Sequence, residues 1–263
     1  MNNKTKVVWI TGASSGIGAE LARQYSNFGV KLILSSRRAD VLEQVKSECS
    51  NSENIKILPF DLIDFKSMSK LVKSAYEFFG TIDILINNAG VSQRSLIIDT
   101  EFEVYKKLIE INYLGHVSLS NAILPYFIEQ GGGSFVVVSS VMGKYSSPYR
   151  SGYAAAKHAL HGYFDALRME HQNDDIYVTI ICPGFVNTSI SKNSFTGDGT
   201  PLGQYDRANS RGLQVDFLAK KIISATSQKK WEVSFGGKER MGVYLKRLSN
   251  KLLHYIVKKS NVR

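Results

Sequence analysis

Short apolar runs recur along the chain and alternate with segments of helical periodicity. Each run is nearly continuous in apolar residues and lacks the polar alternation of a half-solvated strand. Such runs are typical of parallel strands that are covered on both faces. The pattern predicts strands at 7–11, 31–36, 55–60, 82–87, 134–140, 176–182 and 231–235.

Helical patterns separate these runs. Ile17, Leu21 and Tyr25 recur at helical spacing after the first run. Further helices are expected at 41–49, 67–79, 101–130, 151–172 and 215–227. Strands that alternate with helices form βαβ units. The sequence therefore predicts an α/β fold: a single doubly wound Rossmann-type domain over 1–263, with about seven parallel strands and helices on both faces.

Residues 189–212 interrupt this alternation with a polar, glycine-containing stretch that has no helical or strand pattern. A connection longer than about 15 residues in a compact domain is usually functional. We therefore expect 189–212 to form a lid.

The composition indicates a globular protein and argues against a membrane-spanning one. The hydrophobic fraction of 43% and the charged fraction of 21% are ordinary for a globular domain. No apolar run approaches the roughly 18 residues of a membrane span. Cys49 and Cys182 fit neither a CxxC motif nor a metal-ligand spacing, so no metal site is expected. The opening MNNKTKVVWITGASSG has no signal-peptide core, and we expect a cytoplasmic location in a reducing compartment.

The net charge of +10 is concentrated near the end of the chain. Residues 238–263 contain eight Lys or Arg and one Glu, and the remainder is close to balance, which argues against a nucleic-acid-binding face. In the same segment Met241, Tyr244, Leu245, Leu248, Leu252 and Ile256 recur at helical spacing. We expect a basic amphipathic helix, which either lies on an anionic membrane surface, binds a partner or packs on the domain.

A glycine-rich turn, TGASSGIG, follows the first predicted strand and leads into a helix. Gly12 suits the sharp turn, Gly16 allows a bound group to approach the backbone, and Gly18 allows the helix to pack close to the sheet. The amide groups and dipole at the start of that helix favour a pyrophosphate. GK[ST] is missing, which excludes a P-loop, and the turn predicts a dinucleotide site.

The end of the second strand indicates which dinucleotide is bound. The strand ends in Ser35, Ser36, Arg37 and Arg38, with no acidic residue before Asp40. An acidic side chain here pairs with the 2′-hydroxyl of NAD, whereas arginine accommodates the 2′-phosphate of NADP. Arg37 and Arg38 favour NADP(H); the alternative is a solvated pair of loop arginines.

Tyr153 and Lys157 lie four residues apart in the alanine-rich SGYAAAKHAL, on one face of a predicted helix. A nearby ammonium group lowers the pKa of a phenol, which favours proton exchange. Tyr255 and Lys259 have the same spacing. The spacing alone therefore identifies no site.

Further motifs follow the predicted strands in order. Asp61 follows the third strand, NNAG (87–90) the fourth, Ser139 and Ser140 end the fifth, and PGFVNT (183–188) follows the sixth. With TGASSGIG, Asn112, Tyr153 and Lys157, this series resembles the short-chain dehydrogenase/reductase superfamily over nearly the whole chain. Within it, SSPYRSGYAAAKHAL and the basic C-terminal segment are most similar to the branch around 11-beta-hydroxysteroid dehydrogenase and member 7-type dehydrogenase/reductases.

The resemblance implies a role for each matching position. Tyr153 would be the catalytic acid/base, Lys157 its partner, Ser140 the holder of the substrate oxygen and Asn112 a support of the proton relay. Together with the turn and strand-end residues above, it implies a cofactor site formed by Gly12, Ser14, Ser15, Gly16, Ile17, Gly18, Arg37, Arg38, Asp61, Leu62, Asn88, Ala89, Gly90, Tyr153, Lys157, Pro183, Gly184, Val186 and Thr188.

Several of these residues also have a purely structural interpretation. Asn112 can bend a helix and Ser140 can cap a strand end without taking part in chemistry. His158 and His161 are interpreted as packing or surface residues, and Arg150 as a solvated loop arginine rather than a group that binds an acidic substrate.

We therefore expect an NADP(H)-dependent oxidoreductase that interconverts an alcohol and a ketone or aldehyde. The alternative is a catalytically idle NADP(H)-binding sensor or scaffold, which the intact set of Ser140, Tyr153 and Lys157 disfavours. The expected substrate is a small alcohol or carbonyl compound, and lipophilic compounds are included in this class. We also expect further copies of the chain as partners, in a homodimer or homotetramer built on helices 101–130 and 151–172.

Overall fold

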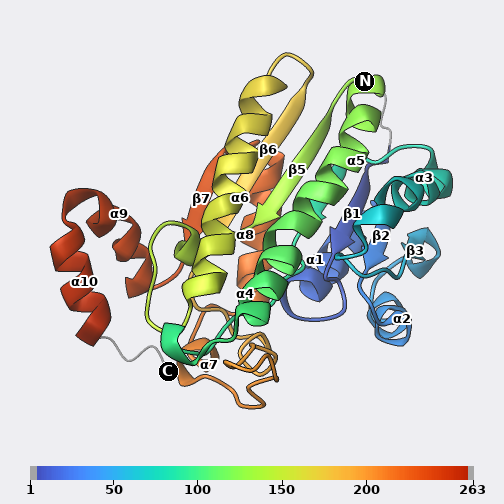
Figure 1. Ribbon diagram of the computed structural model, residues 1–263. Coiled ribbons are helices and arrows are strands. Elements are labelled where there is room, and N and C mark those ends of the chain that lie inside the picture. Colours follow the sequence, from blue (N-terminus) through green and yellow to red (C-terminus); the bar gives the residue numbers. More distant parts are fainter. Residues whose placement is uncertain (1–4, 260–263) are drawn as a thin grey trace.

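The computed structural model describes residues 5–259, with only the backbone described at 207 and 208. One parallel sheet organises the chain, with strand order β3-β2-β1-β4-β5-β6-β7 (Figure 1). The strands are β1 (Val7–Thr11), β2 (Lys31–Ser35), β3 (Ile55–Ile57), β4 (Ile84–Asn87), β5 (Gly133–Val138), β6 (Ile176–Pro183) and β7 (Glu232–Phe235). The order reverses between β1 and β4, where doubly wound sheets bind ligands at the carboxyl ends of the strands. The predicted fold class is confirmed.

Helices cover both faces of the sheet (Figure 1). Val8 and Ile10 of β1 pack on one face with α1 (Gly16–Ser26), α2 (Ala39–Ser47) and α8 (Val215–Ser227). Val7 and Trp9 pack on the other face with α3 (Met68–Phe79), α5 (Gly115–Glu129) and α6 (Ser151–Glu170). Side chains alternate between the two faces of a strand, which explains why an uninterrupted apolar run fills two cores.

The helix expected at 101–130 is divided into three parts. α4 (Phe102–Ile109) and α5 are joined by a π-helical turn at Glu110–Leu114, which contains the buried Asn112. Single π turns within helices are frequent at functional sites. Short 3-10 turns lie at Ser52–Asn54, Phe65–Ser67, Ile97–Asp99, Val141–Gly143 and Lys238–Arg240.

The 189–212 segment is docked on the loop that follows β4. Phe195 N donates to Ser92 O (2.9 Å), Arg94 N donates to Phe195 O (2.8 Å), and Glu101 N donates to Gly197 O (2.9 Å). The segment ends with the short helix α7 (Arg207–Ser210).

The expected single C-terminal helix is wrong, because the chain forms two helices. α9 (Met241–Leu248) and α10 (Asn250–Lys259) are separated by Ser249, which is extended with φ −157° and ψ 107°. Leu245 and Leu253 pack on a cluster that contains Tyr145 and Tyr153, whereas Leu248 remains 81% exposed. Among residues 5–259, no helix has both the length and the apolar character needed to cross a bilayer.

Candidate active site

A cavity of about 660 Å³ opens at the carboxyl ends of the strands. Its walls come from the loops after β1, β2, β3, β4, β5 and β6, from α6 and from the 189–212 segment. The cavity brings together the predicted site residues Gly12, Ser14, Ser15, Gly16, Ile17, Arg37, Arg38, Asp61, Leu62, Asn88, Ala89, Gly90, Asn112, Ser140, Tyr153, Lys157, Pro183, Gly184, Val186 and Thr188. Gly18 does not line the cavity and lies beneath the glycine-rich turn.

The glycine-rich turn has the geometry of an anion cradle. Gly12 (φ +65°) and Gly16 (φ +54°) adopt left-handed conformations that favour glycine. A Cβ atom at Gly12 would lie 2.8 Å from Ala89 Cα. The side chain of Ser15 makes no capping hydrogen bond, and the first turn of α1 lines the cavity. These residues fit the pyrophosphate of a dinucleotide.

Gly18 allows close packing beneath this cradle. A Cβ atom there would lie 2.3 Å from Gly12 O and 2.6 Å from Asn88 Nδ2. Asn88 Nδ2 in turn donates to Thr11 O (2.9 Å), and Asn88 N donates to Thr11 Oγ1 (3.0 Å). The NNAG loop is thereby clamped to the turn after β1.

The opposite end of the cavity is basic. Arg37 and Arg38 are exposed where β2 ends, and both line the cavity. The backbone there is ordered by the Arg38 N–H, which donates to Ser36 Oγ (3.3 Å). Asp61 and Leu62 lie after β3 on the neighbouring wall. This end fits the adenosine part of a dinucleotide.

Tyr153 lies in the first turn of α6 and is 8% exposed. Burial raises the pKa of Tyr153, while a hydrogen bond with Ser140 and the charges of Arg150 and Arg94 oppose that rise. Positive charge and hydrogen bonding stabilise the phenolate relative to the phenol. The phenol is therefore placed to exchange a proton with a group in the cavity.

Lys157 lies one turn further along α6 and is also buried. Its Nζ donates to Val138 O (2.8 Å) and lies 5.8 Å from the centroid of the Tyr153 ring. Burial lowers the pKa of Lys157 to about 8.

Two serines, Ser139 and Ser140, directly follow β5 and make different contacts. Ser139 Oγ lies 3.0 Å from His161 Nε2 and donates to Lys157 O (3.3 Å), so it braces α6. Ser140 Oγ accepts from Met142 N (3.1 Å) and donates to Pro183 O (3.3 Å), and its interaction with the Tyr153 hydroxyl opposes the rise in the pKa of Tyr153. Ser140 is therefore the hydroxyl that lies beside the phenol, and it also caps the turn that follows β5.

Asn112 connects the π turn to the NNAG loop. Its Oδ1 accepts from Val91 N (3.0 Å), and its Nδ2 donates to Val91 O (2.9 Å) and Leu108 O (3.0 Å). A Cβ atom on Gly90 would lie 2.7 Å from Asn112 Oδ1 and 3.6 Å from Lys157 Nζ. Asn112, Gly90 and Lys157 thus meet on one wall of the cavity.

Sequence reasoning missed two buried residues that support the site. Gln93 Oε1 accepts from Gly152 N (2.8 Å) and Tyr153 N (3.3 Å), and so caps the start of α6. His116 lies 2.8 Å from Ala89 O through Nε2, and burial lowers its pKa to about 3. The only sequence signal that could have identified Gln93 is its closeness to the NNAG motif. For His116, the only such signal is its position one helical turn after Asn112.

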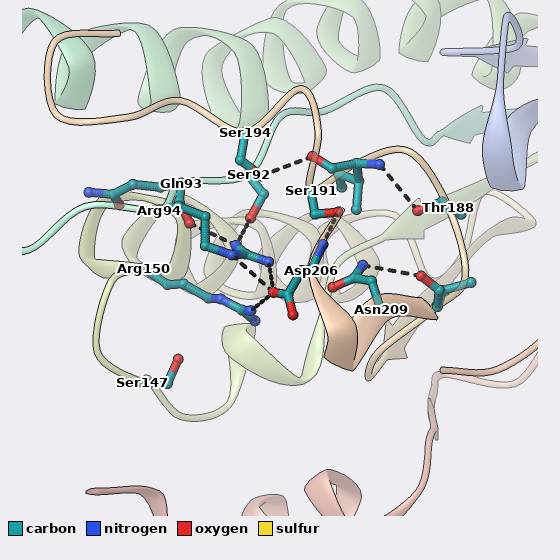
Figure 2. A network of polar contacts seen from close by, with 12 residues as sticks. Ser92, Gln93, Arg94, Ser147, Arg150, Thr188, Ser191, Ser194, Asp206 and Asn209 are labelled. Carbon is teal, nitrogen blue, oxygen red and sulfur yellow. Dashed lines mark hydrogen bonds and ion pairs between the residues drawn. The ribbon is translucent and has the colours of Figure 1, made fainter. Parts of the chain in front are cut away.

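The interpretation of Arg150 as a solvated loop residue is wrong. Its side chain is only 8% exposed, and its Nη2 lies 3.5 Å from Asp206 Oδ2. Arg94 donates to the same oxygen from Nε (3.2 Å) and Nη2 (2.9 Å) (Figure 2). Arg94 and Arg150 line the cavity. Because Asp206 lies 56 positions after Arg150 in the chain, no local pattern indicates this burial.

A second polar cluster lies behind α6. His161, Cys182 and Glu232 place one ligand-type atom each within 4.8 Å of the others. Lys144 Nζ already pairs with Glu232 Oε2 at 2.5 Å, and burial raises the pKa of Cys182 to about 12. Both features oppose a bound cation. His161 is buried, as expected for a packing residue, and His158 is exposed.

Known proteins resemble this chain over most of its length. A model of the family described as short chain dehydrogenase matches residues 6–199. Dehydrogenase/reductase SDR family member 7 from Homo sapiens is 50% identical over 200 residues, which cover 74% of this chain and 59% of that protein. Dehydrogenase/reductase SDR family member 7B from Rattus norvegicus is 38% identical over 262 residues, which cover 97% of this chain and 81% of that protein.

A solved structure shows the same fold. The alcohol dehydrogenase of the archaeon Thermococcus sibiricus, complexed with 5-hydroxy-NADP, superposes with a TM-score of 0.74 at 25% identity, over 90% of this chain and 98% of that one. With the family model and the two relatives, this likeness establishes that the chain belongs to the short-chain dehydrogenase family of NAD(P)-using oxidoreductases.

Proposed function

We propose that the protein interconverts an alcohol and a ketone or aldehyde with NADP(H), using Tyr153 as the acid/base. The observation that carries this proposal is the meeting of Ser140, Tyr153 and Lys157 with the glycine-rich turn around one cavity. The nicotinamide cofactor, when bound, supplies or accepts the hydride. The chain binds and orients both molecules and handles the proton.

The proton is transferred at the Tyr153 oxygen. In the reduction direction, the substrate carbonyl oxygen gains negative charge and takes the phenolic proton. In the oxidation direction, the phenolate takes the proton of the substrate hydroxyl. Ser140 donates a hydrogen bond to the same substrate oxygen. General acid or base catalysis of this kind contributes about 10²–10⁴-fold to the rate.

The environment of Tyr153 favours this exchange. Arg150 and Arg94 lower the pKa of the phenol against the effect of burial. Lys157 and Asn112 meet near Gly90, on the side of the cavity where Tyr153 also lies. We propose that Lys157 binds the cofactor ribose and takes part in returning a proton to Tyr153. Asn112 would hold this wall of the cavity in position.

The preference for NADP(H) rests on Arg37 and Arg38. Both are exposed cavity residues at the end of β2, and no carboxylate lies between β2 and Asp40. A guanidinium group binds a phosphate through paired, charge-assisted hydrogen bonds. A ribose 2′-phosphate therefore has a suitable binding partner here, whereas the end of β2 offers no acidic acceptor for a 2′-hydroxyl.

A substrate panel tests the proposal. NADPH absorbance is followed with ketones and aldehydes, and NADP⁺ reduction with the matching alcohols. We expect turnover of at least one carbonyl class with NADPH. NADPH binding without turnover of any panel member would instead support the idle sensor or scaffold.

We further propose that the protein is a homodimer or homotetramer that pairs through α5 and α6. Outside its own stretch of α6, a Cβ atom added to Gly162 would meet no atom of residues 5–259 within 4 Å. Leu114, which immediately precedes α5, and Ile128, near the end of α5, are 39% and 43% exposed. Light scattering measures the mass, and Gly162→Trp should then yield monomers.

We also propose that α9 and α10 contact an anionic membrane surface, so that the protein is cytoplasmic and peripheral to that membrane. Leu248, Leu252 and Tyr255 are exposed, and the neighbouring Arg247 and Lys251 are exposed as well. Apolar side chains bordered by basic ones suit the interface of an anionic bilayer.

A further inference from the structure

Arg150 is a buried cation whose nitrogen atoms are not all used. It immediately precedes α6 and is 6% exposed. Its Nε and Nη2 are buried and make no hydrogen bond with the described part of the chain. Burying a charge without hydrogen-bonding partners is costly, so proteins normally supply them. Arg150 therefore has N–H groups that can donate hydrogen bonds to a ligand.

The carboxylate beside Arg150 is engaged by another arginine. Asp206 Oδ2 accepts two hydrogen bonds from Arg94 but lies 3.5 Å from Arg150 Nη2 (Figure 2). Arg94 Nη1 donates to Ser92 Oγ (2.9 Å) and Gln93 O (2.7 Å), so all three of its nitrogens are used. Two guanidinium groups thus share one carboxylate, and Arg150 is the less neutralised of the two.

Other groups at this end of the cavity increase the positive charge. Lys157 lines the same cavity. Glu239 does not line it, and its Oε1 is occupied by a hydrogen bond that it accepts from Phe185 N (3.1 Å). The Arg150 guanidinium lies 5.3 Å from the centroid of the Phe185 ring. A guanidinium against an aromatic ring is held in orientation and can still bind a carboxylate through two N–H groups.

We propose that Arg150 is a specificity residue that binds a carboxylate on the substrate, so that the preferred substrates are oxo acids and the corresponding hydroxy acids. The carboxylate would contact Arg150 while the carbonyl or hydroxyl lies at Ser140 and Tyr153. Arg150 is three residues before Tyr153 and lines the same cavity, which suits one small molecule that reaches both. This inference rests on the proposed oxidoreductase function and adds the substrate class to it.

Matched pairs of compounds separate this role from a general effect on activity. The probes are benzoylformate and 3-benzoylpropanoate, each compared with its methyl ester, with NADPH as reductant. The measured quantity is the ratio of kcat/KM for acid over ester. Because Tyr153 reacts with both members of a pair, this ratio removes effects of a substitution on Tyr153 or on the amount of folded protein.

We expect Arg150→Met to lower the acid-over-ester ratio by about 10–150-fold, the range that a charge-assisted hydrogen bond of about 1.5–3 kcal/mol supplies. Arg150→Lys should retain part of the preference because it keeps the charge. Arg168→Met is the matched control: Arg168 lies in the last turn of α6, whereas Arg150 immediately precedes that helix, and Arg168 does not line the cavity. Its ratio should equal that of the unaltered protein.

Asp206→Asn distinguishes acid binding from a purely structural contact. If Arg150 binds substrate, removal of the competing carboxylate should raise the acid-over-ester ratio. If Asp206 and Arg150 only fasten the 189–212 segment, Asp206→Asn and Arg150→Met should lower acid and ester turnover in the same proportion. That second result would overturn the inference.

A binding measurement keeps the test independent of turnover. Calorimetric titration of the NADPH complex compares 3-phenylpropanoate with 3-phenylpropanamide, neither of which has a reducible ketone. We expect the acid to bind at least about 10-fold more tightly, and Arg150→Met to abolish the difference. Equal binding of acid and amide overturns the inference, even if esters are reduced. Tight acid binding without turnover of any carbonyl instead contradicts the proposed function alone.

Discussion

The side-chain oxygen of Gln93 accepts a hydrogen bond from the backbone N–H of Gly152 at 2.8 Å. The same oxygen accepts from Tyr153 N at 3.3 Å, and Gln93 is fully buried. The first amides of a helix have no partner within the helix and require an outside acceptor. Gln93 supplies this acceptor, and it thereby fastens the first turn of α6, which carries the Tyr153 phenol, to the loop after NNAG.

Gln93→Leu should therefore destabilise the protein and reduce turnover. The substitution leaves two buried N–H groups without their acceptor, which costs about 1–3 kcal/mol. Urea unfolding measures the loss in the free energy of unfolding. Gln172→Leu, at an exposed position after α6, is the control and should change that free energy by less than about 0.5 kcal/mol. Equal stability of the two variants would show that the cap is unimportant.

Acid should destabilise the protein through His116. The folded-state pKa is lowered from 6.5 to about 3 by burial. Between these values the unfolded chain binds a proton that the folded chain does not, so the free energy of unfolding falls as the pH is lowered from 6.5 towards 3. This one group contributes a slope of about 1.4 kcal/mol per pH unit in that window.

His116→Gln should remove this contribution. Unfolding by urea at a series of pH values between about 6.5 and 4 measures the slope, which should become shallower by about one proton. Gln172→Leu, at an exposed position after α6, replaces no titratable group, serves as the control and should leave the slope unchanged. An identical slope in the His116 variant and the unaltered protein would contradict the assignment.

Arg37→Ala should weaken NADPH binding far more than NADH binding. The lost contact is to the 2′-phosphate, and charge-assisted hydrogen bonds contribute about 1.5–3 kcal/mol, or about 10–150-fold in Kd. Fluorescence titration of both cofactors measures this. Arg247→Ala, exposed on α9, is the control and should change neither Kd. Equal losses for NADPH and NADH would refute the role of Arg37.

The intact chain should sediment with vesicles that contain phosphatidylserine at low salt and much less with pure phosphatidylcholine vesicles. Replacing Leu248 and Leu252 with Gln should reduce binding, because both are exposed on the proposed membrane face. Phe28→Gln, at a residue after α1 that is 67% exposed, is the control. If the intact chain stays in the supernatant with anionic vesicles, α9 and α10 do not bind membranes.

The sequence predicts the fold well because its signals are local. Each apolar run needs only a few residues to identify a buried parallel strand, and the motifs at 12–18, 87–90 and 183–188 all follow such runs. Parallel strands end at one edge of the sheet, so these motifs meet there by topology. Tyr153 and Lys157 meet them because α6 packs beside β5 and β6.

The features that the sequence does not predict depend on contacts between distant segments. The burial of Arg150 requires Asp206, which lies in a segment without periodicity. The interruption at Ser249 falls inside an apolar stripe that looks continuous in the sequence, and it allows Leu253 to reach the cluster around Tyr145. In each case, packing against the body of the domain determines the local structure. A local sequence pattern does not predict such packing.

Tyr153→Phe tests the central claim most directly. The substitution removes one hydroxyl and little of the packing of a buried ring, so the variant should fold and bind NADPH with an unchanged Kd. Stopped-flow measurement of a single turnover with a carbonyl substrate should show a rate reduced by at least about 10²-fold, since the hydroxyl supplies the proton. A variant that binds NADPH and retains more than about a tenth of the rate would contradict the account.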